Sequence, residues 1–505
     1  MRLRSGLEVA HTATSSAQHR ESRKRPHGPN FTGPQIFKKP KVDRRGSRPK
    51  ISWGDLPAEL RLLILEEVGK LEHQKHELAS YATVSREWQY FFERKNFEYL
   101  AISQHDVSKF GKIVQKQRRS LVRWIWLRLR IPRYNCERCD KPESLEEIQR
   151  NNAMFIKAIR GLFGILSTWE SKGPYAASEK GVTLELSAHS ESDGKHYFLG
   201  IDSRIHDNGR SGKTLSFKKP PHSQTHGWIK GQRVKEPPEG AVDRIFGPIC
   251  GLFLAVYHGE LLPILPKVKV IQSLVIRRQF YRAFSITDAL NLIIQCLTQL
   301  ESFTYEPWSE MSRTIRDENG DLELQNNIDI LDILNHAESL RRVTIWQDCN
   351  YERLHWIWHD SEVWPDSSTL SEYFIRSSQR LDGLHLSNYI DAMYLFAPFR
   401  PGICPSEKKG IYWKNLKYLS LTSSTLNPRT YHLVNWAAAG AAQVMPQLQV
   451  MEIRTHTRTE ACILRYERRA YRPRVQFMST WNGFLSTGEK KVGNRSTSVW
   501  QHSWA

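Results

Sequence analysis

The chain of 505 residues contains only seven cysteines and seven methionines, and it has no apolar run long enough to cross a membrane. A membrane-spanning helix needs about 20 apolar residues, and the apolar stretch GPICGLFLAVYHG at 247–259 is too short. An odd, scattered set of cysteines indicates free thiols in a reducing compartment. The N-terminus carries charge where a signal peptide needs its apolar region. We therefore expect neither a membrane protein nor a secreted one.

Motifs that bind nucleotides or activate nucleophiles are also missing. The sequence has no G-x-x-x-x-G-K-[ST] phosphate loop, no G-x-G-x-x-G turn and no G-x-S-x-G elbow. In HELAS, His76 begins a zinc-peptidase pattern, but Ser80 stands where the second histidine belongs. The sequence therefore predicts a protein that is not an enzyme, with no catalytic residue and no cofactor.

The pair Cys136-x-x-Cys139, in YNCERCDKP, has the spacing of two zinc ligands. A structural zinc site needs four ligands, and no second C-x-x-C or H-x-x-x-H motif follows within reach of this pair in the sequence. We therefore predict no metal site and a loop with two free thiols, with zinc as the alternative.

The net charge of +20 is concentrated at the N-terminus. Residues 1–50 hold 13 Lys/Arg and 3 Asp/Glu, which leaves 60 and 50 for the other 455 residues. This segment is rich in Pro, Gly and Ser, so it buries too little apolar surface to offset its ordering entropy. We predict a disordered basic tail. Its clusters RKRP (23–26) and KKPK (38–41) have the spacing of a bipartite nuclear import signal, and a solvated basic arm is the alternative.

From about residue 120, short strands are predicted to alternate with longer helices. An apolar-x-x-apolar-x-apolar pattern recurs six times, with starts 29 to 41 residues apart. It occurs in IQSLVI (271–276), LESFTY (300–305), LRRVTI (340–345), LDGLHL (381–386), LKYLSL (416–421) and LQVMEI (448–453), and in looser form in WIWLRL (124–129) and GVTLEL (181–186). Helices are predicted over 144–166, 285–300, 327–340, 368–381 and 430–445. Ser285 and Asp288 form a pattern similar to a capping box.

Helix and strand repeated in this way are typical of a solenoid whose units bury their apolar faces against neighbours. The strand pattern matches the L-x-x-L-x-L motif of leucine-rich repeats, although most repeats are longer than usual and lack the following Asn or Cys. We predict an irregular, leucine-rich-repeat-like α/β horseshoe over 104–480. It would carry a basic loop insertion near 203–240 and be followed by a tail at 481–505.

An amphipathic helix is predicted directly after the basic tail, in DLPAELRLLILEEV at 55–68. Asp55 can serve as its N-cap, and Pro57 fits its first turn. Two short helices follow at 77–85 and 86–100. The ordered elements are Leu56-Pro57, Glu59-Leu60, Ile64-Leu65, Val84-Ser85-Arg86 and Trp88. With these elements, the segment 51–103 resembles an F-box.

The resemblance implies a small three-helix unit that binds the Skp-type adaptor of a Skp–cullin–F-box ubiquitin ligase. About fifty residues bury too little surface to be stable alone, so such a unit benefits from packing on a partner. The contacts implied are Leu56, Pro57, Leu60, Ile64, Leu65, Val84 and Trp88. The alternative is that these side chains belong to the core of the neighbouring solenoid.

A repeat domain behind an F-box implies a surface that holds a substrate protein. Residues between the apolar positions of each strand would form the concave face. The candidates for substrate binding are Arg277, Glu306, Arg342, Trp346, His385, Tyr418, Glu452 and Arg454. This mixture of polar and aromatic residues is typical of protein-binding surfaces, and it differs from the uniformly basic strip of a nucleic-acid groove.

Together these patterns predict a non-catalytic substrate adaptor in the nucleus or the cytoplasm. Its partners would be a Skp-type adaptor, a cullin reached through that adaptor, and an unknown target protein. Neither a membrane nor nucleic acid is expected as a partner. The alternative is a nuclear nucleic-acid-associated protein that uses the basic tail and the loop at 203–240.

Overall fold

The structure is a computed structural model, and it separates into an N-terminal unit, Arg2–Asn96, and a second unit, Phe97–Ala505. The residues that it describes are 52–70, 77–170, 181–199, 223–247, 249, 265–278, 282–308, 321–347, 368–400, 402, 410–456, 460–470 and 473–481. The predicted tail at 1–50, the predicted tail at 481–505 apart from Trp481, and most of the predicted loop insertion lie outside these residues. The predicted domain boundary at 103 differs from that of the structure, because residues 99–103 form a strand of the second unit.

The N-terminal unit contains the three helices predicted for it. A 3₁₀ turn, η1 (Trp53–Asp55), precedes α1 (Ala58–Lys70), α2 (Glu77–Tyr81) and α3 (Arg86–Glu98). Asp55 is the last residue of η1 and not the N-cap of α1: Ser52 is the N-cap of η1, and the carboxylate of Asp55 accepts hydrogen bonds of 2.8 Å from its backbone and hydroxyl. Pro57 directly precedes α1, and its carbonyl accepts the first helical hydrogen bond, from Arg61 at 3.1 Å.

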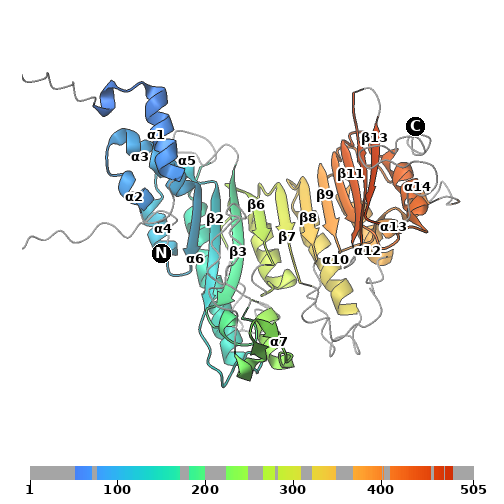
Figure 1. Cartoon of the computed structure of the whole chain (residues 1–505), viewed down its shortest axis with the longest axis horizontal. Coiled ribbons are helices and arrows are strands. Elements are labelled where there is room, and N and C mark those ends of the chain that lie inside the picture. The colour runs from blue at the N-terminus through green and yellow to red at the C-terminus, as the bar shows by residue number, and fades with distance from the viewer. Residues whose placement is uncertain are drawn as a thin grey trace, which may run out of the picture. The chain divides into compact units, whose positions relative to one another are not determined.

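The second unit is a mixed α/β structure with a large sheet of 11 strands, eight of whose ten neighbouring pairs are parallel (Figure 1). The strands lie side by side in chain order, and only the last two join the sheet antiparallel. They are β1 (Tyr99–Ser103), β2 (Trp124–Ile131), β3 (Val182–Ser190), β6 (Ile271–Ile276), β7 (Ser302–Tyr305), β8 (Arg342–Trp346), β9 (Gly383–Ser387), β10 (Tyr418–Thr422), β11 (Val450–His456), β12 (Ala461–Glu467) and β13 (Arg474–Ser479). A separate hairpin pairs β4 (Trp228–Ile229) with β5 (Gln232–Arg233).

The strand predictions are confirmed. All six strict patterns coincide with β6 to β11, and the two looser patterns coincide with β2 and β3. The sequence patterns did not predict β1, whose first two residues were placed at the end of a helix, or the hairpin of β12 and β13. Both β12 and β13 pair antiparallel, so they need no helical crossover and do not repeat the pattern of the preceding units.

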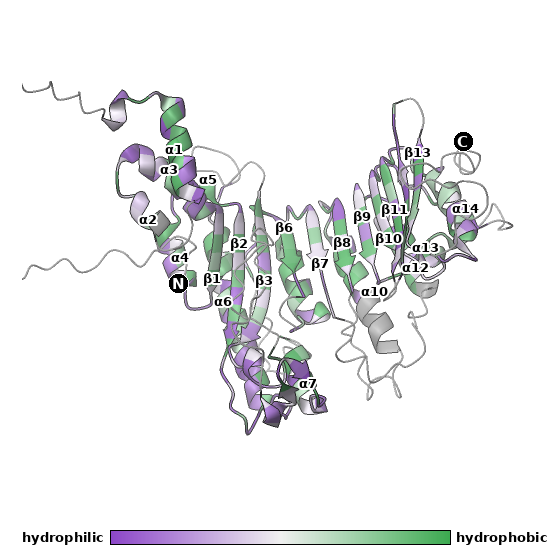
Figure 2. Cartoon of the chain, viewed as in Figure 1, coloured by the Kyte–Doolittle hydropathy of each residue, from purple (hydrophilic) through white to green (hydrophobic). Residues whose placement is uncertain are grey.

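The core lies on one face of the sheet, where the register aligns buried apolar residues into rows. One row runs across six neighbouring strands and consists of Leu274, Phe303, Val343, Leu384, Leu419 and Met451. Residues two positions further along each strand, such as Ile276, Ile345 and Ile453, are also buried. Because strand side chains alternate between the two faces, both sets lie on the same side of the sheet. Bands of apolar and polar residues alternate along the strands in Figure 2.

Among the described residues, the helices of the second unit include the five predicted segments and four helices that were not predicted, over 107–113, 117–121, 239–246 and 392–395. They are α4 (Val107–Ile113), α5 (Gln117–Leu121), α6 (Leu145–Leu166), α7 (Glu239–Phe246), α8 (Asn291–Cys296), α10 (Asp321–His336), α12 (Ser368–Ser378), α13 (Ala392–Leu395) and α14 (Tyr431–Ala442), with short turns η2 (Asp193–Lys195), η3 (Gln224–His226), η4 (Ile286–Leu290) and η5 (Ala397–Phe399). Consecutive helices contact one another from α8 through α14. Ser285 caps η4 as predicted, since its hydroxyl accepts a 3.3 Å hydrogen bond from the backbone of Asp288.

Glu185 is a buried carboxyl on β3, on the face away from the apolar rows. The indole of Trp124 donates a 2.8 Å hydrogen bond to it, and the guanidinium of Arg277 lies 3.4 Å away. Burial raises the pKa of Glu185 to about 7, against the opposing effects of Arg277 and Trp124. The folded chain therefore keeps this proton at pH values where the unfolded chain has lost it.

We expect Glu185 to make stability fall as the pH rises from about 4.5 to about 7, because ionisation favours the unfolded chain in that window. The Glu185→Gln variant should remove a pH-dependent loss on the order of 3 kcal/mol, since one pKa unit corresponds to about 1.4 kcal/mol. Chemical denaturation at pH 5 and pH 8 measures this difference. The Glu338→Gln variant, at an exposed position, is the control. The prediction is contradicted when the free energies of unfolding of the wild type and of Glu185→Gln differ by the same amount at both pH values.

Candidate functional site

Helix α1 exposes a cluster of aliphatic side chains, which we call the α1 apolar surface. It consists of Leu60, Leu62, Leu63 and Ile64, and their exposed fractions are 47%, 49%, 55% and 39%. Leu60, Leu63 and Ile64 lie on one face because residues three and four positions apart are neighbours on a helix. Helix α1 is largely apolar along its length in Figure 2. Single exposed leucines are ordinary, but a contiguous apolar patch marks an interaction site.

The sequence-predicted adaptor contacts divide into surface and core. Pro57, Leu60, Ile64 and Val84 are exposed, and Leu56 is half-buried. Leu65 is completely buried, so its prediction as a contact is wrong. It follows Ile64 by one residue, which rotates its side chain about 100° around the helix and into the core of the unit.

Trp88 also serves the core of the N-terminal unit. Its ring lies 5.5 Å from that of Trp53, 6.0 Å from that of Tyr81 and 5.6 Å from that of Phe92. Phe92 and Leu65 are the fully buried centre of this aromatic group. Trp88 is half-buried, so it stabilises the core of the unit more than it contributes exposed area to the α1 apolar surface.

A polar clamp that the sequence reading missed connects η1, α1 and α3. The carboxylate of Glu87 accepts a 2.8 Å hydrogen bond from the indole of Trp53 and a 2.9 Å hydrogen bond from Arg61. The hydrogen bond from Trp53 is the main cause that lowers the pKa of Glu87. Arg61 also donates to the backbone carbonyl of Leu56 at 3.0 Å. This clamp fixes the start of α1 against α3 and so orients the α1 apolar surface.

The residues predicted for the concave face do lie on one face of the sheet. We call it the polar sheet face, since it is opposite to the buried apolar rows. Register places Arg342 beside Gly383 and then Tyr418, and Thr344 beside His385 and then Ser420. None of the eight candidates is buried: they are Arg277, Glu306, Arg342, Trp346, His385, Tyr418, Glu452 and Arg454.

Arginines and aromatic rings pair across the polar sheet face. The guanidinium of Arg278 lies 4.4 Å from the ring centroid of Trp346, and that of Arg277 lies 5.6 Å from that of Trp124. Towards the C-terminal strands of the sheet, Arg465 on β12 forms a 2.7 Å ion pair with Glu452 on β11. Exposed aromatic and arginine side chains are the residues that dominate protein-binding energies. The face carries both signs of charge.

His385 lies on this face between Thr344 and Ser420, near both Arg454 and Glu452. Burial and the nearby Arg454 lower the pKa of His385, so the imidazole is neutral near pH 7. Arg454 itself donates a 2.7 Å hydrogen bond to the hydroxyl of Ser420 on the neighbouring strand.

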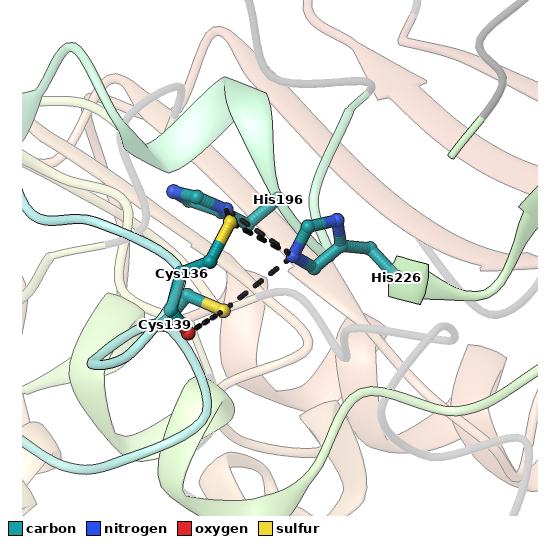
Figure 3. A group of neighbouring side chains, drawn as sticks. All are labelled: Cys136, Cys139, His196 and His226. Carbon is teal, nitrogen blue, oxygen red and sulfur yellow. Dashed lines mark hydrogen bonds between the residues drawn. The ribbon is translucent and has the colours of Figure 1, made fainter. Parts of the chain in front are cut away.

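The structure brings two histidines to the Cys136–Cys139 pair, and this overturns the reason for predicting no metal site. Cys136 and Cys139 follow β2, His196 follows η2, and His226 ends η3. Their ligand atoms all lie within 4.8 Å of one another (Figure 3). The histidines are 57 and 87 residues beyond Cys139, so they are near the pair only in the folded chain. A signal was present in HSQTH at 222–226, which has the H-x-x-x-H spacing.

Burial affects the protonation of this cluster. Burial and the adjacent His226 lower the pKa of His196, which favours the neutral imidazole. Burial and the proximity of Cys136 raise the pKa of the Cys139 thiol. Cys139, His196 and His226 are buried, whereas Cys136 is exposed.

The fold defines a mixed α/β protein built on a large, mostly parallel sheet. Residues 335–501, which are 167 of the 505, match a family described as a family of unknown function (DUF6546). The matched region includes β8 to β13. No curated protein and no solved structure matches the chain. Among the described residues, no helix combines the length and the apolar character needed to span a bilayer.

In the N-terminal unit, Leu65 is a core position and Leu63 a surface position of the same helix, so substituting each distinguishes the two roles. Leu65→Ala should destabilise this unit by about 2–5 kcal/mol, because it leaves a cavity beside Phe92. Leu63→Ala should change stability by no more than about 0.5 kcal/mol, because that side chain is 55% exposed. Hydrogen exchange of α1 and α3 amides in the full chain measures both effects. Equal destabilisation by the two variants would contradict this assignment.

Proposed function

We propose that this chain is the substrate-recognition subunit of a Skp–cullin–F-box ubiquitin ligase. The α1 apolar surface would dock on the Skp-type adaptor, and the polar sheet face would bind the target protein. The observation that carries the proposal is the exposure of Leu60, Leu63 and Ile64 on a three-helix unit with an F-box-like order of residues. A solvent-exposed aliphatic cluster of this kind costs free energy unless a partner covers it.

The α1 apolar surface can contribute part of the free energy of specific binding. Full burial of a leucine or isoleucine is worth about 1.5–3 kcal/mol. Leu60, Leu63 and Ile64 are each 39–55% exposed, so covering all three contributes a few kcal/mol. Pro57 and Val84 add exposed apolar area. Micromolar binding needs about 8 kcal/mol beyond the costs of association, so these side chains would form the apolar centre of a larger interface.

The second unit suits the role of a target-binding domain. Its strands follow one another in chain order and its helices contact their chain neighbours. We interpret this arrangement as an irregular leucine-rich-repeat-like solenoid, whose polar sheet face is a continuous surface of parallel strands. Its aromatic and arginine pairs provide anchors for a protein partner. The acidic Glu306 and Glu452 on the same face disfavour nucleic acid as the ligand.

No residue of this chain needs to react in such a complex. A substrate adaptor accelerates ubiquitin transfer because it raises the effective concentration of target lysines near a conjugating enzyme held by the same complex. The cullin would be reached through the Skp-type adaptor. The nucleus and the cytoplasm, where such ligases act, are the proposed locations.

Adaptor capture tests the first half of the proposal. The Leu60→Ala/Ile64→Ala variant should bind a Skp-type adaptor at least about tenfold more weakly than the wild type, because it removes apolar area from the α1 apolar surface. Alanine favours the helix, so α1 should remain folded. Co-purification and titration with the purified adaptor measure this.

The control is Leu145→Ala, which removes a leucine that is 52% exposed in the first turn of α6. It should capture the adaptor as the wild type does. A wild-type chain that captures no Skp-type adaptor contradicts the proposed function, and so does equal capture by the double variant.

Target capture tests the second half. Trp346→Ala should reduce retention of target proteins about tenfold or more while the proteasome is blocked, because it removes an exposed aromatic anchor from the polar sheet face. Trp436→Ala is the matched control, since Trp436 is 49% exposed on α14. Both variants should capture the adaptor normally. Identical sets of retained proteins for the two variants would show that the polar sheet face does not hold the target.

A further inference from the structure

We propose that Cys136, Cys139, His196 and His226 bind a structural zinc ion. This is a property of the second unit, and it is separate from the proposed binding of an adaptor. The four side chains come from three segments of the chain and converge at one point (Figure 3). The ligand atoms are the two Sγ atoms, Nδ1 of His196 and Nε2 of His226.

Four of the six distances between the ligand atoms are close to those of a tetrahedral site, and all six are within 4.8 Å. Bonds of about 2.3 Å to sulfur and about 2.0–2.1 Å to nitrogen place two nitrogen ligands ~3.3 Å apart, and a sulfur and a nitrogen ~3.6 Å apart. The two nitrogens are 3.3 Å apart. Sγ of Cys136 lies 3.6 Å from Nδ1 of His196 and 3.8 Å from Nε2 of His226, and Sγ of Cys139 lies 3.5 Å from that Nε2. One zinc ion fits with no more than small movements.

Neighbouring side chains orient the histidines for this role. Nδ1 of His226 lies 2.7 Å from the hydroxyl of Ser223 and 3.2 Å from that of Thr225, which leaves Nε2 for the metal. Such an outer hydrogen bond on the second ring nitrogen is the usual companion of a zinc-bound histidine. The ring of Tyr134 stacks on that of His196 with centroids 5.3 Å apart.

The ligand set selects both the metal and its role. Two thiolates and two imidazoles in tetrahedral geometry favour zinc over the harder cations magnesium and calcium, which prefer oxygen ligands. Four protein ligands leave no open position for water or substrate, so the site is structural. A redox-active thiol pair is the competing interpretation of Cys136-x-x-Cys139, but it does not explain two imidazole nitrogens at ligand distances from the sulfurs.

The zinc would hold three connections of the second unit together. The cysteines follow β2 and His196 follows β3, which are neighbouring parallel strands whose carboxyl ends meet at the same edge of the sheet. His226 directly precedes the β4–β5 hairpin. A metal that links Cys139 to His196 and His196 to His226 closes loops of 57 and 30 residues, whose freedom in the unfolded chain is considerable.

A buried ion pair between α6 and α7 stabilises the region of the loop that carries the cysteines. Arg244 on α7 forms a 3.1 Å ion pair with Glu147 on α6, and it also donates to the backbone carbonyls of Lys141 and Pro142. Burial alone would raise the pKa of Glu147, but hydrogen bonds from Arg244, Ser144 and Arg138, together with the charge of Arg244, outweigh it and bring the pKa to about 2. The loop that carries the cysteines is thus fixed to α6 and α7 at one end, and the zinc would fix its other end.

Metal content of the full chain tests the proposal. Wild-type protein purified without chelator from zinc-supplemented cells should contain about one zinc per chain, measured by elemental analysis. Cys136→Ala should bind zinc at least about 100-fold more weakly, and Ser223→Ala about 10–100-fold more weakly, because Ser223 orients His226. Cys296→Ala, at a buried cysteine outside the cluster, should keep the zinc. Wild-type protein nearly free of zinc, or an unchanged zinc affinity in Cys136→Ala, would overturn the proposal.

Cobalt provides a measurement on the wild type that does not depend on how the variants fold. Metal-free full chain titrated with Co²⁺ should develop the intense visible bands of tetrahedral cobalt and a thiolate charge-transfer band, with an endpoint at one ion per chain. Zinc should then displace the cobalt. A weak octahedral spectrum would overturn the proposal, and so would a Cys136–Cys139 disulfide in protein purified under reducing conditions.

Discussion

The structure depends on the burial of two in-register apolar rows under a layer of helices. In parallel strands that follow one another in chain order, a side-chain period of two keeps every second residue on the core side. Leu384 therefore lies between Val343 and Leu419, and the same alignment continues along the sheet. Because a slip of one residue would expose an entire row, this burial also determines which residues form the polar sheet face.

The two candidate binding surfaces arise from the core in different ways. On the sheet, the residues that alternate with the buried apolar rows must lie on the polar sheet face. The register that aligns the core therefore also fixes the positions of these polar residues. In the N-terminal unit, a helix with too many leucines for its small core leaves some of them exposed. Leu65 is buried beside Phe92, and Leu60 and Leu63 are left in solvent. A surface of this kind favours a partner that covers it, which is the basis of the proposed adaptor docking.

Local sequence patterns predicted most strands and the longer helices, because the alternation of apolar and polar residues reflects which face of each element is buried. The six strict strand motifs became neighbouring strands, and the helices between them formed close to their predicted limits. Predictions failed where contacts between distant parts of the chain, and not the local sequence pattern, determine the structure. Residues 99 and 100 were assigned to a helix but belong to β1, which pairs with β2, and the antiparallel strands β12 and β13 do not repeat the parallel pattern. Leu65 was assigned to a surface because amphipathicity alone does not say which side of a helix faces a partner.

Three features could be predicted from the sequence alone: the alternation of strands and helices, the position of the amphipathic helix after the basic tail, and the membership of the polar sheet face. These features follow from periods of two and 3.6 residues, which need only neighbouring positions in the chain. The folded chain was needed to show which leucines of α1 are exposed and that His196 and His226 meet the two cysteines. For the metal ligands, the cause is their separation along the chain. A metal site requires ligands that are close in space, and the fold alone brings together side chains separated by 57 and 30 residues.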